Sequence, residues 1–249
     1  MMASAKVVSH LAVFLLLFTA NYNDFSRGYS SNLSFKSDGE GRKGASYAGR
    51  WKYLSILVSV AQMVFFGSCV LSDVFEAILG RKPGVLKALQ RVQDYLFAVL
   101  LFPMAMTVQC LFWAIYAIDR ELVYPSKLDA IIPTWLNHVW HTTTVPVLLL
   151  EMYVVRRRYP ARTAALPGTV FFGAAYLIWI RIVAHYGGFW VYPFLEVMGP
   201  IGTSVFNMAA VGMLCVFYMV GEYVNTKLWG RDAFEISSTT SRKKSNKSA

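Results

Sequence analysis

The chain has 249 residues, of which 56% are hydrophobic and only 15% charged, whereas a soluble domain carries about a quarter charged residues. This balance excludes an ordinary soluble globular domain. The formal net charge of +10 does not indicate nucleic-acid binding, because the Lys and Arg residues lie between apolar runs and in the tails. In such places basic residues set orientation and contact anionic lipid headgroups.

Long apolar runs predict an all-α fold, a polytopic membrane helix bundle in a single transmembrane domain over residues 1–230. Pro103 predicts a kink in the third helix. The Ser/Thr/Lys-rich residues 231–249 predict a disordered basic tail. The six transmembrane helices are expected over about residues 7–22, 51–79, 92–118, 133–153, 164–186 and 199–228.

The first apolar run, residues 7–22, has two readings. It follows a single lysine and ends near Thr19 and Ala20, as a cleaved signal peptide does. Cleavage would leave five spans. We favour a retained helix, because six spans fit the charges of the loops better.

Basic residues in the loops predict that both termini are cytoplasmic. Residues 80–91 and 154–163 each contain four Lys or Arg and no acid, and such loops stay on the cytoplasmic side. The sequon at Asn32 would then lie outside and accept a glycan, whereas the sequon at Asn246 would not. The sequence does not distinguish the plasma membrane from the endoplasmic reticulum, and it leaves the oligomeric state open.

Polar side chains within the predicted spans are the most informative feature, because they are costly in hydrocarbon and often mark function. Arg181 and His185 are adjacent on the fifth helix. With a rise of about 1.5 Å per residue, Ser55 lies about 6 Å and His141 about 12 Å below the outer ends of their helices. Two polar stripes recur at helical spacing: Trp51, Ser55, Ser59, Gln62, Cys69 and Asp73 on the second helix, and Asn137, His141, Thr144, Leu148 and Glu151 on the fourth.

Ser55 and His141 are a candidate catalytic pair, because a serine becomes nucleophilic when a nearby histidine takes its proton. A serine in a transmembrane helix more often bonds the backbone or a neighbouring helix. His138 and His141 can instead ligate a metal or haem iron, with His185 as a third ligand. By spacing alone, a channel or transporter is as well supported as an enzyme.

Several long motifs cover residues 47–230 and occur in a fixed order. The sequence resembles the family of androgen-induced proteins and androgen-dependent TFPI-regulating proteins in all of them. They read WKYLS from Trp51, FFGSCVLSD from Phe65, IDRELVYP from Ile118, PTWLNHVWHTTTVP from Pro133 and FWVYPFLE from Phe189.

The resemblance implies a multi-pass membrane hydrolase that cleaves fatty acid esters of hydroxy fatty acids with a threonine nucleophile and a histidine. The family histidine falls at His141. The nucleophile falls at position 55, where this chain has serine in place of threonine. Serine keeps the hydroxyl and loses the β-branch, so we expect the same reaction with a different rate and substrate fit.

We therefore expect Ser55 to attack the ester and His141 to act as general base and then general acid. Asn137 would orient His141 or donate to the oxyanion, and His138 and His185 are supporting candidates. We expect a lipid ester substrate, contact with membrane lipids, and no metal or organic cofactor. The alternative is a non-catalytic lipid-binding, signalling or transport scaffold, in which the same polar residues hold the helices together.

Overall fold

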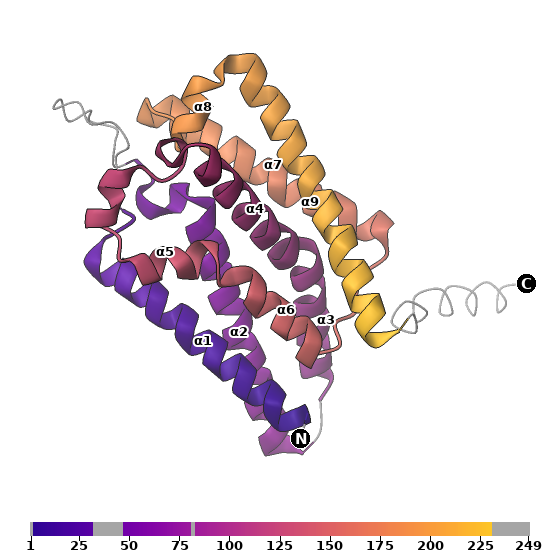
Figure 1. The fold of residues 1–249 in the computed structure, drawn as a ribbon. Helices are drawn as coiled ribbons and strands as arrows, with labels where there is room; N and C mark the ends of the chain where they lie inside the picture. The colour runs from indigo at the N-terminus through magenta and orange to yellow at the C-terminus, as the bar shows by residue number, and fades with distance from the viewer. Residues whose placement is uncertain (1, 32–46, 81–82, 231–249) are drawn as a thin grey trace, which may run out of the picture.

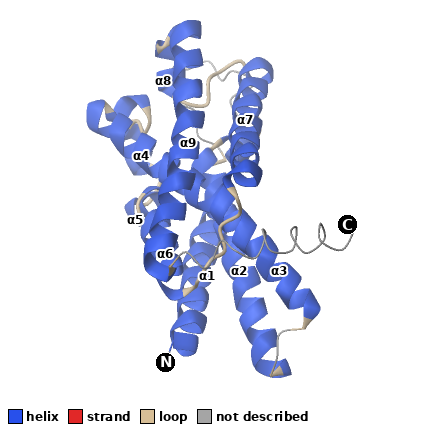
Figure 2. Cartoon of the chain, turned by 90° about the vertical axis from the view of Figure 1, so that its right-hand side faces the viewer, coloured by secondary structure: helices blue, strands red, loops and turns tan. Residues whose placement is uncertain are grey.

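The computed structural model describes residues 2–31, 47–80 and 83–230, and these ranges contain helices and turns but no strand (Figure 2). Five helices are long and apolar enough to cross a membrane. The all-α prediction is therefore confirmed, and the chain is built as a multi-pass membrane protein. The five are α1 (Met2–Arg27), α2 (Leu54–Leu79), the continuous helix Gly84–Ile118, α7 (Arg162–Gly187) and α9 (Gly199–Trp229).

The predicted fourth span is a broken pair of helices, α5 (Thr134–His141) and α6 (Thr144–Val154). Pro146 explains the break, because its ring has no N–H and clashes with the carbonyl of the residue four positions earlier. At the end of α5, the Thr143 hydroxyl donates to the carbonyl of His138 at 2.9 Å. His141 therefore stands at the end of a helix rather than within one, where α5 gives way to α6 (Figure 1).

The predicted third span is longer than expected. Its helix begins at Gly84 rather than near residue 92, with α3 (Gly84–Leu96), a π-helical turn η2 (Phe97–Leu101) and α4 (Phe102–Ile118) in succession. Pro103 stands in the first turn of α4. A π-helical turn lies just before Pro103. It interrupts the regular helical hydrogen bonding in which proline, which has no backbone N–H, cannot take part.

The first apolar run forms α1, which lies against α2 and α6 (Figure 1). Two of its polar residues are buried in the bundle: Asn21 donates to Ser59 Oγ at 3.1 Å, and His10 contacts carboxylates on other helices. A helix that supplies such contacts is part of the fold, so removal of α1 as a signal peptide would leave those partners unpaired. The sequons at Asn32 and Asn246 and the tail 231–249 lie outside the described residues.

The start of α1 and the end of α9 lie at the same end of the bundle (Figure 1), as the prediction of two cytoplasmic termini requires. Which end faces the cytoplasm is still predicted from the basic loops. We call the end with the start of α2 the outer end, and the end with the start of α1 the inner end. Three short helices lie near the outer end: η3 (Arg120–Leu122), η4 (Ser126–Ala130) and α8 (Pro193–Val197).

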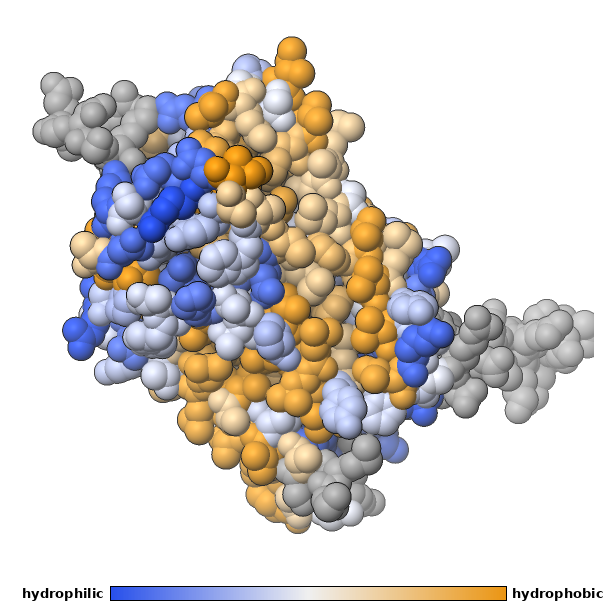
Figure 3. Space-filling view, in the orientation of Figure 1, coloured by the Kyte–Doolittle hydropathy of each residue, from blue (hydrophilic) through white to orange (hydrophobic). Residues whose placement is uncertain are grey.

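Large apolar side chains face outward along the long helices, and Ile201, Met208 and Ile78 are among the most exposed. Figure 3 shows apolar residues over much of one face, with hydrophilic residues gathered on one side near the outer end. Such a continuous apolar surface would be unfavourable in water and suits contact with lipid.

Candidate active site

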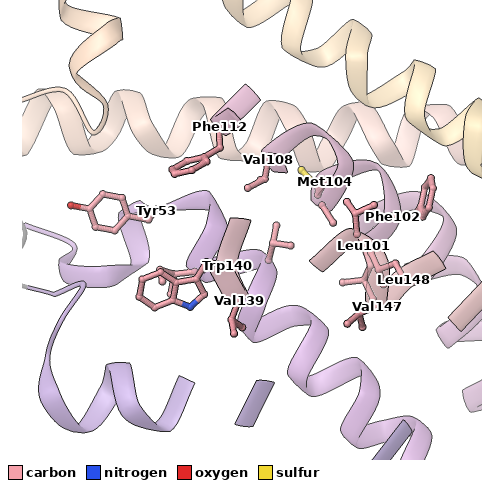
Figure 4. Close-up of a cluster of buried hydrophobic side chains, with 14 of the residues drawn as sticks. Tyr53, Leu101, Phe102, Met104, Val108, Phe112, Val139, Trp140, Val147 and Leu148 are labelled. Atoms are coloured by element: carbon pink, nitrogen blue, oxygen red, sulfur yellow. The ribbon is translucent and has the colours of Figure 1, made fainter. Parts of the chain in front are cut away.

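Ser55 and His141 line the same cavity, which has a volume of about 140 Å³ and mostly apolar walls. Side chains of α2, α4, α7 and α9 and the end of α5 enclose it. Figure 4 shows part of this region, with Tyr53, Met104, Val108, Phe112 and Trp140 around it. The structure thus brings the two predicted residues to one apolar chamber, and no hydrogen bond joins them among the described contacts.

His141 is held from two helices. Its Nδ1 lies 2.8 Å from Oδ1 of Asn137, one turn earlier on α5. The Asn137 side-chain oxygen can only accept, so Nδ1 carries the proton and Nε2 keeps a lone pair. Phe112 of α4 stacks on the imidazole with ring centroids 3.7 Å apart. The contacts fix both the tautomer and the plane of the ring.

The main chain of His141 is also hydrogen-bonded to α4. Trp113 donates from its indole Nε1 to the His141 carbonyl at 2.7 Å. Because the helix breaks after this residue, the carbonyl would otherwise face hydrocarbon without a partner.

Ser55 stands in the first turn of α2 and is half-buried. Two tyrosines anchor this helix start: Tyr192 accepts from the backbone N–H of Leu54 at 3.1 Å, and its hydroxyl lies 2.9 Å from that of Tyr176. The backbone N–H groups of Ser55 and Ile56 have no backbone acceptor among the described residues. The first turn of a helix leaves such donors free, and its dipole favours negative charge there.

The other two predicted histidines lie outside the cavity. His138 is exposed, lies 3.0 Å from Thr142 Oγ1 and stacks on Trp113. His185 is exposed on α7, packs edge-on against Tyr186, and lines a separate groove. The three histidines therefore do not form a common ligand set, because helical spacing fixes their height but not which way each helix face turns.

A second buried polar cluster lies towards the inner end, and two of its residues, His10 and Arg157, were not among the candidates from the sequence. The Nδ1 of His10 is 2.6 Å from Asp73 and its Nε2 is 3.1 Å from Glu151. Arg157 forms ion pairs with Glu151 and Asp94. His10 could have been identified in the sequence, because it is an ionisable residue within the first apolar run. Its partners could not be predicted from helical spacing.

This inner cluster also contains the one set of metal-type donors that assembles within the described part of the chain. Donor atoms of His10, Cys69 and Glu151 lie within 4.8 Å of one another. The guanidinium of Arg157 occupies hydrogen-bonding positions on both Glu151 and Cys69, the latter at 3.4 Å. A cation already fills the place of a metal, so the donors fit an ion-pair cluster better than a metal centre.

Comparison with known proteins agrees with the motifs. The sequence model of FAR-17a/AIG1-like proteins matches residues 5–226. The human androgen-induced gene 1 protein is 41% identical over 190 residues, which cover 74% of this chain and 79% of that protein. The mouse androgen-dependent TFPI-regulating protein is 37% identical over 184 residues, covering 73% of this chain and 78% of that protein. No solved structure matches.

Proposed function

This chain belongs to the FAR-17a/AIG1-like protein family, and from that premise we propose that it is an intramembrane hydrolase of lipid esters. Fatty acid esters of hydroxy fatty acids are the proposed substrates. The enzyme would act within the plasma membrane or the endoplasmic reticulum, where its substrates are dissolved in the surrounding lipid.

The observation that carries the proposal is the shared cavity. A hydroxyl and an imidazole open into one chamber whose walls are otherwise largely apolar. Such walls suit a fatty acyl chain, and they exclude water from the reacting atoms, which strengthens electrostatic interactions there.

The arrangement of His141 supports the role of a base. With Nδ1 donating to Asn137, the lone pair on Nε2 is available for a proton. Ser55 Oγ attacks the ester carbonyl carbon as its proton passes to Nε2, and the resulting tetrahedral intermediate carries a negative oxygen. Collapse of the intermediate expels the alkoxide, which takes the proton from His141 and leaves as an alcohol. Water, activated by the same nitrogen, then releases the acyl group from Ser55.

The start of α2 supports stabilisation of the oxyanion. The N–H groups of Ser55 and Ile56, which have no backbone acceptor among the described residues, lie in the first turn of α2 at the positive end of the helix dipole. The scheme requires no metal and no organic cofactor.

Comparison of purified variants in a defined lipid environment tests the proposal. Ser55→Ala and His141→Ala should each lower hydrolysis of a fatty acid ester of a hydroxy fatty acid by at least about 10³-fold. Thr107→Ala is the matched control, because Thr107 is another hydroxyl residue that lines this cavity; it should keep most of the activity.

Full activity in both Ser55→Ala and His141→Ala would remove the proposed pair. Loss in Thr107→Ala alone would assign the nucleophile to α4. Absence of hydrolysis by the wild type, over a range of lipid esters, would favour a non-catalytic scaffold.

A further inference from the structure

An open groove lies beside the cavity on the outer half of the bundle, formed mainly by α7 with one residue of α9. Arg181 and His185 supply its polar groups together with Asn207, and the remaining lining is apolar or aromatic. Arg181 and His185 are four residues apart on α7 and therefore share a helix face.

The groove and the cavity are neighbours. Leu177 of α7 and Asn207 of α9 line both of them, so these two side chains form the boundary between the chamber and the membrane-facing surface. The Oδ1 atom of Asn207 is buried with no hydrogen-bond partner among the described residues. The same side chain carries Nδ2, a donor from which a carboxylate or ester oxygen at this boundary can accept.

Arg181 has no acidic partner among the residues that the structure describes. Its guanidinium lies over the ring of Trp190, 5.5 Å from the centroid, and none of the described carboxylates forms an ion pair with it. An exposed guanidinium on a membrane-facing helix is costly unless an anion neutralises it. Guanidinium groups bind carboxylates with two parallel hydrogen bonds.

We propose that Arg181 and His185 bind the free carboxylate of the lipid substrate at a lateral entrance between α7 and α9, while its ester reaches Ser55 and His141 through the boundary at Leu177 and Asn207. This inference rests on the proposed function. Along α7, Arg181 stands about 6 Å and His185 about 12 Å from Leu177. The site therefore favours esters whose carboxylate is several methylene groups from the ester bond.

Paired substrates test the site: a fatty acid ester of a hydroxy fatty acid with its free carboxylate, and the methyl ester of the same molecule. Loss of a charged hydrogen bond in Arg181→Gln should raise KM for the acid about tenfold or more and leave KM for the methyl ester unchanged. Arg181→Lys should recover part of the preference. Arg91→Gln, an exposed arginine of α3 far along the chain from this groove, is the control and should change neither.

Because both substrates are assayed on the same preparation, a partly unfolded variant would lower both rates and leave their ratio intact. An unchanged ratio in Arg181→Gln would overturn the proposal and indicate that Arg181 only contacts phospholipid headgroups.

A binding measurement separates this inference from the proposed function. In Ser55→Ala, a photoreactive analogue of the free acid should crosslink better than its methyl ester, and adding Arg181→Gln should remove the difference. Preferential crosslinking that depends on Arg181 would support the site even if the wild type hydrolysed neither ester. Equal crosslinking of acid and methyl ester in Ser55→Ala would overturn it.

Discussion

His141 and His10 are both buried histidines, and they differ in what surrounds them. His141 opens into an apolar cavity with one ring nitrogen engaged by Asn137, and its other nitrogen has no hydrogen-bond partner among the described residues. His10 has a carboxylate at each nitrogen, and Arg157 continues the network to Asp94. A group with spare bonding capacity can exchange a proton with a substrate, whereas a fully bonded group stabilises the fold. In the proposed function the outer half would carry the chemistry, whereas the hydrogen bonds and ion pairs of the inner half join the helices.

Exchange of the two histidines for alanine gives the largest expected contrast. His141→Ala should lower kcat/KM by at least about 10³-fold and lower thermal stability less than His10→Ala does, because its ring is not part of a charged network. His10→Ala should instead lower the unfolding temperature, because it leaves Asp73 and Glu151 without their common partner. Activity assays and thermal unfolding in the same detergent measure both. Equal destabilisation by the two changes would remove the distinction.

Arg157 tests the inner cluster most directly. Arg157→Met should destabilise the protein by about 3–5 kcal/mol, because it leaves the buried carboxylate of Asp94 without its ion-pair partner and that of Glu151 with His10 alone. Arg156→Met is the matched control: it removes an exposed arginine next in the chain and should change stability little. Unfolding followed by denaturant titration distinguishes them. Similar stability of the two variants would show that the ion pairs contribute nothing.

Asn137 tests how His141 is oriented. Asn137→Leu should lower kcat about 10- to 100-fold, because the hydrogen bond to the charged imidazolium is lost. Asn137→Asp keeps an acceptor at the same position and should restore most of the rate. His138→Ala, an exposed histidine on the same helix, should be near wild type. A larger loss in His138→Ala than in Asn137→Leu would reverse the assignment of the two residues.

The smallest expected effect comes from adding a methyl group to the side chain of Ser55. Ser55→Thr introduces the β-branched residue that the family motif has at this position, and it restricts the side chain to fewer rotamers. We expect a change in kcat/KM of less than about tenfold, equivalent to about 1.4 kcal/mol. A panel of esters with different branch positions would show whether the change depends on substrate shape. A loss as large as that of Ser55→Ala would contradict a hydroxyl nucleophile at this position.

Much of the outer site could be predicted from the sequence, because apolar runs locate helices and helical spacing locates depth. Helical spacing placed Ser55 and His141 at similar depth, and the family resemblance singled them out as a catalytic pair; both line one cavity. His185 was expected to support the site, but it lines a separate groove outside the cavity. α7 is apolar on most sides, so its sequence does not fix which face turns inward.

The inner cluster was harder to predict, for a physical reason. His10 meets partners 63 and 141 residues away, and such contacts depend on how four helices pack rather than on local pattern. The break between α5 and α6 was missed for a different reason, because the fourth span was predicted as one continuous helix. Pro146 was visible in the sequence, and its effect on the preceding turn follows from backbone geometry alone.

That break has a mechanical consequence. Bilayers differ in thickness, and membrane helices respond by tilting. A continuous helix would pass such a tilt directly to His141. Here the chain bends at Thr142 and Thr143, while Phe112 and Trp113 fasten His141 to α4. α6 would then follow the thickness of its host membrane while the imidazole keeps its alignment, so the proposed activity would tolerate membranes of unlike composition.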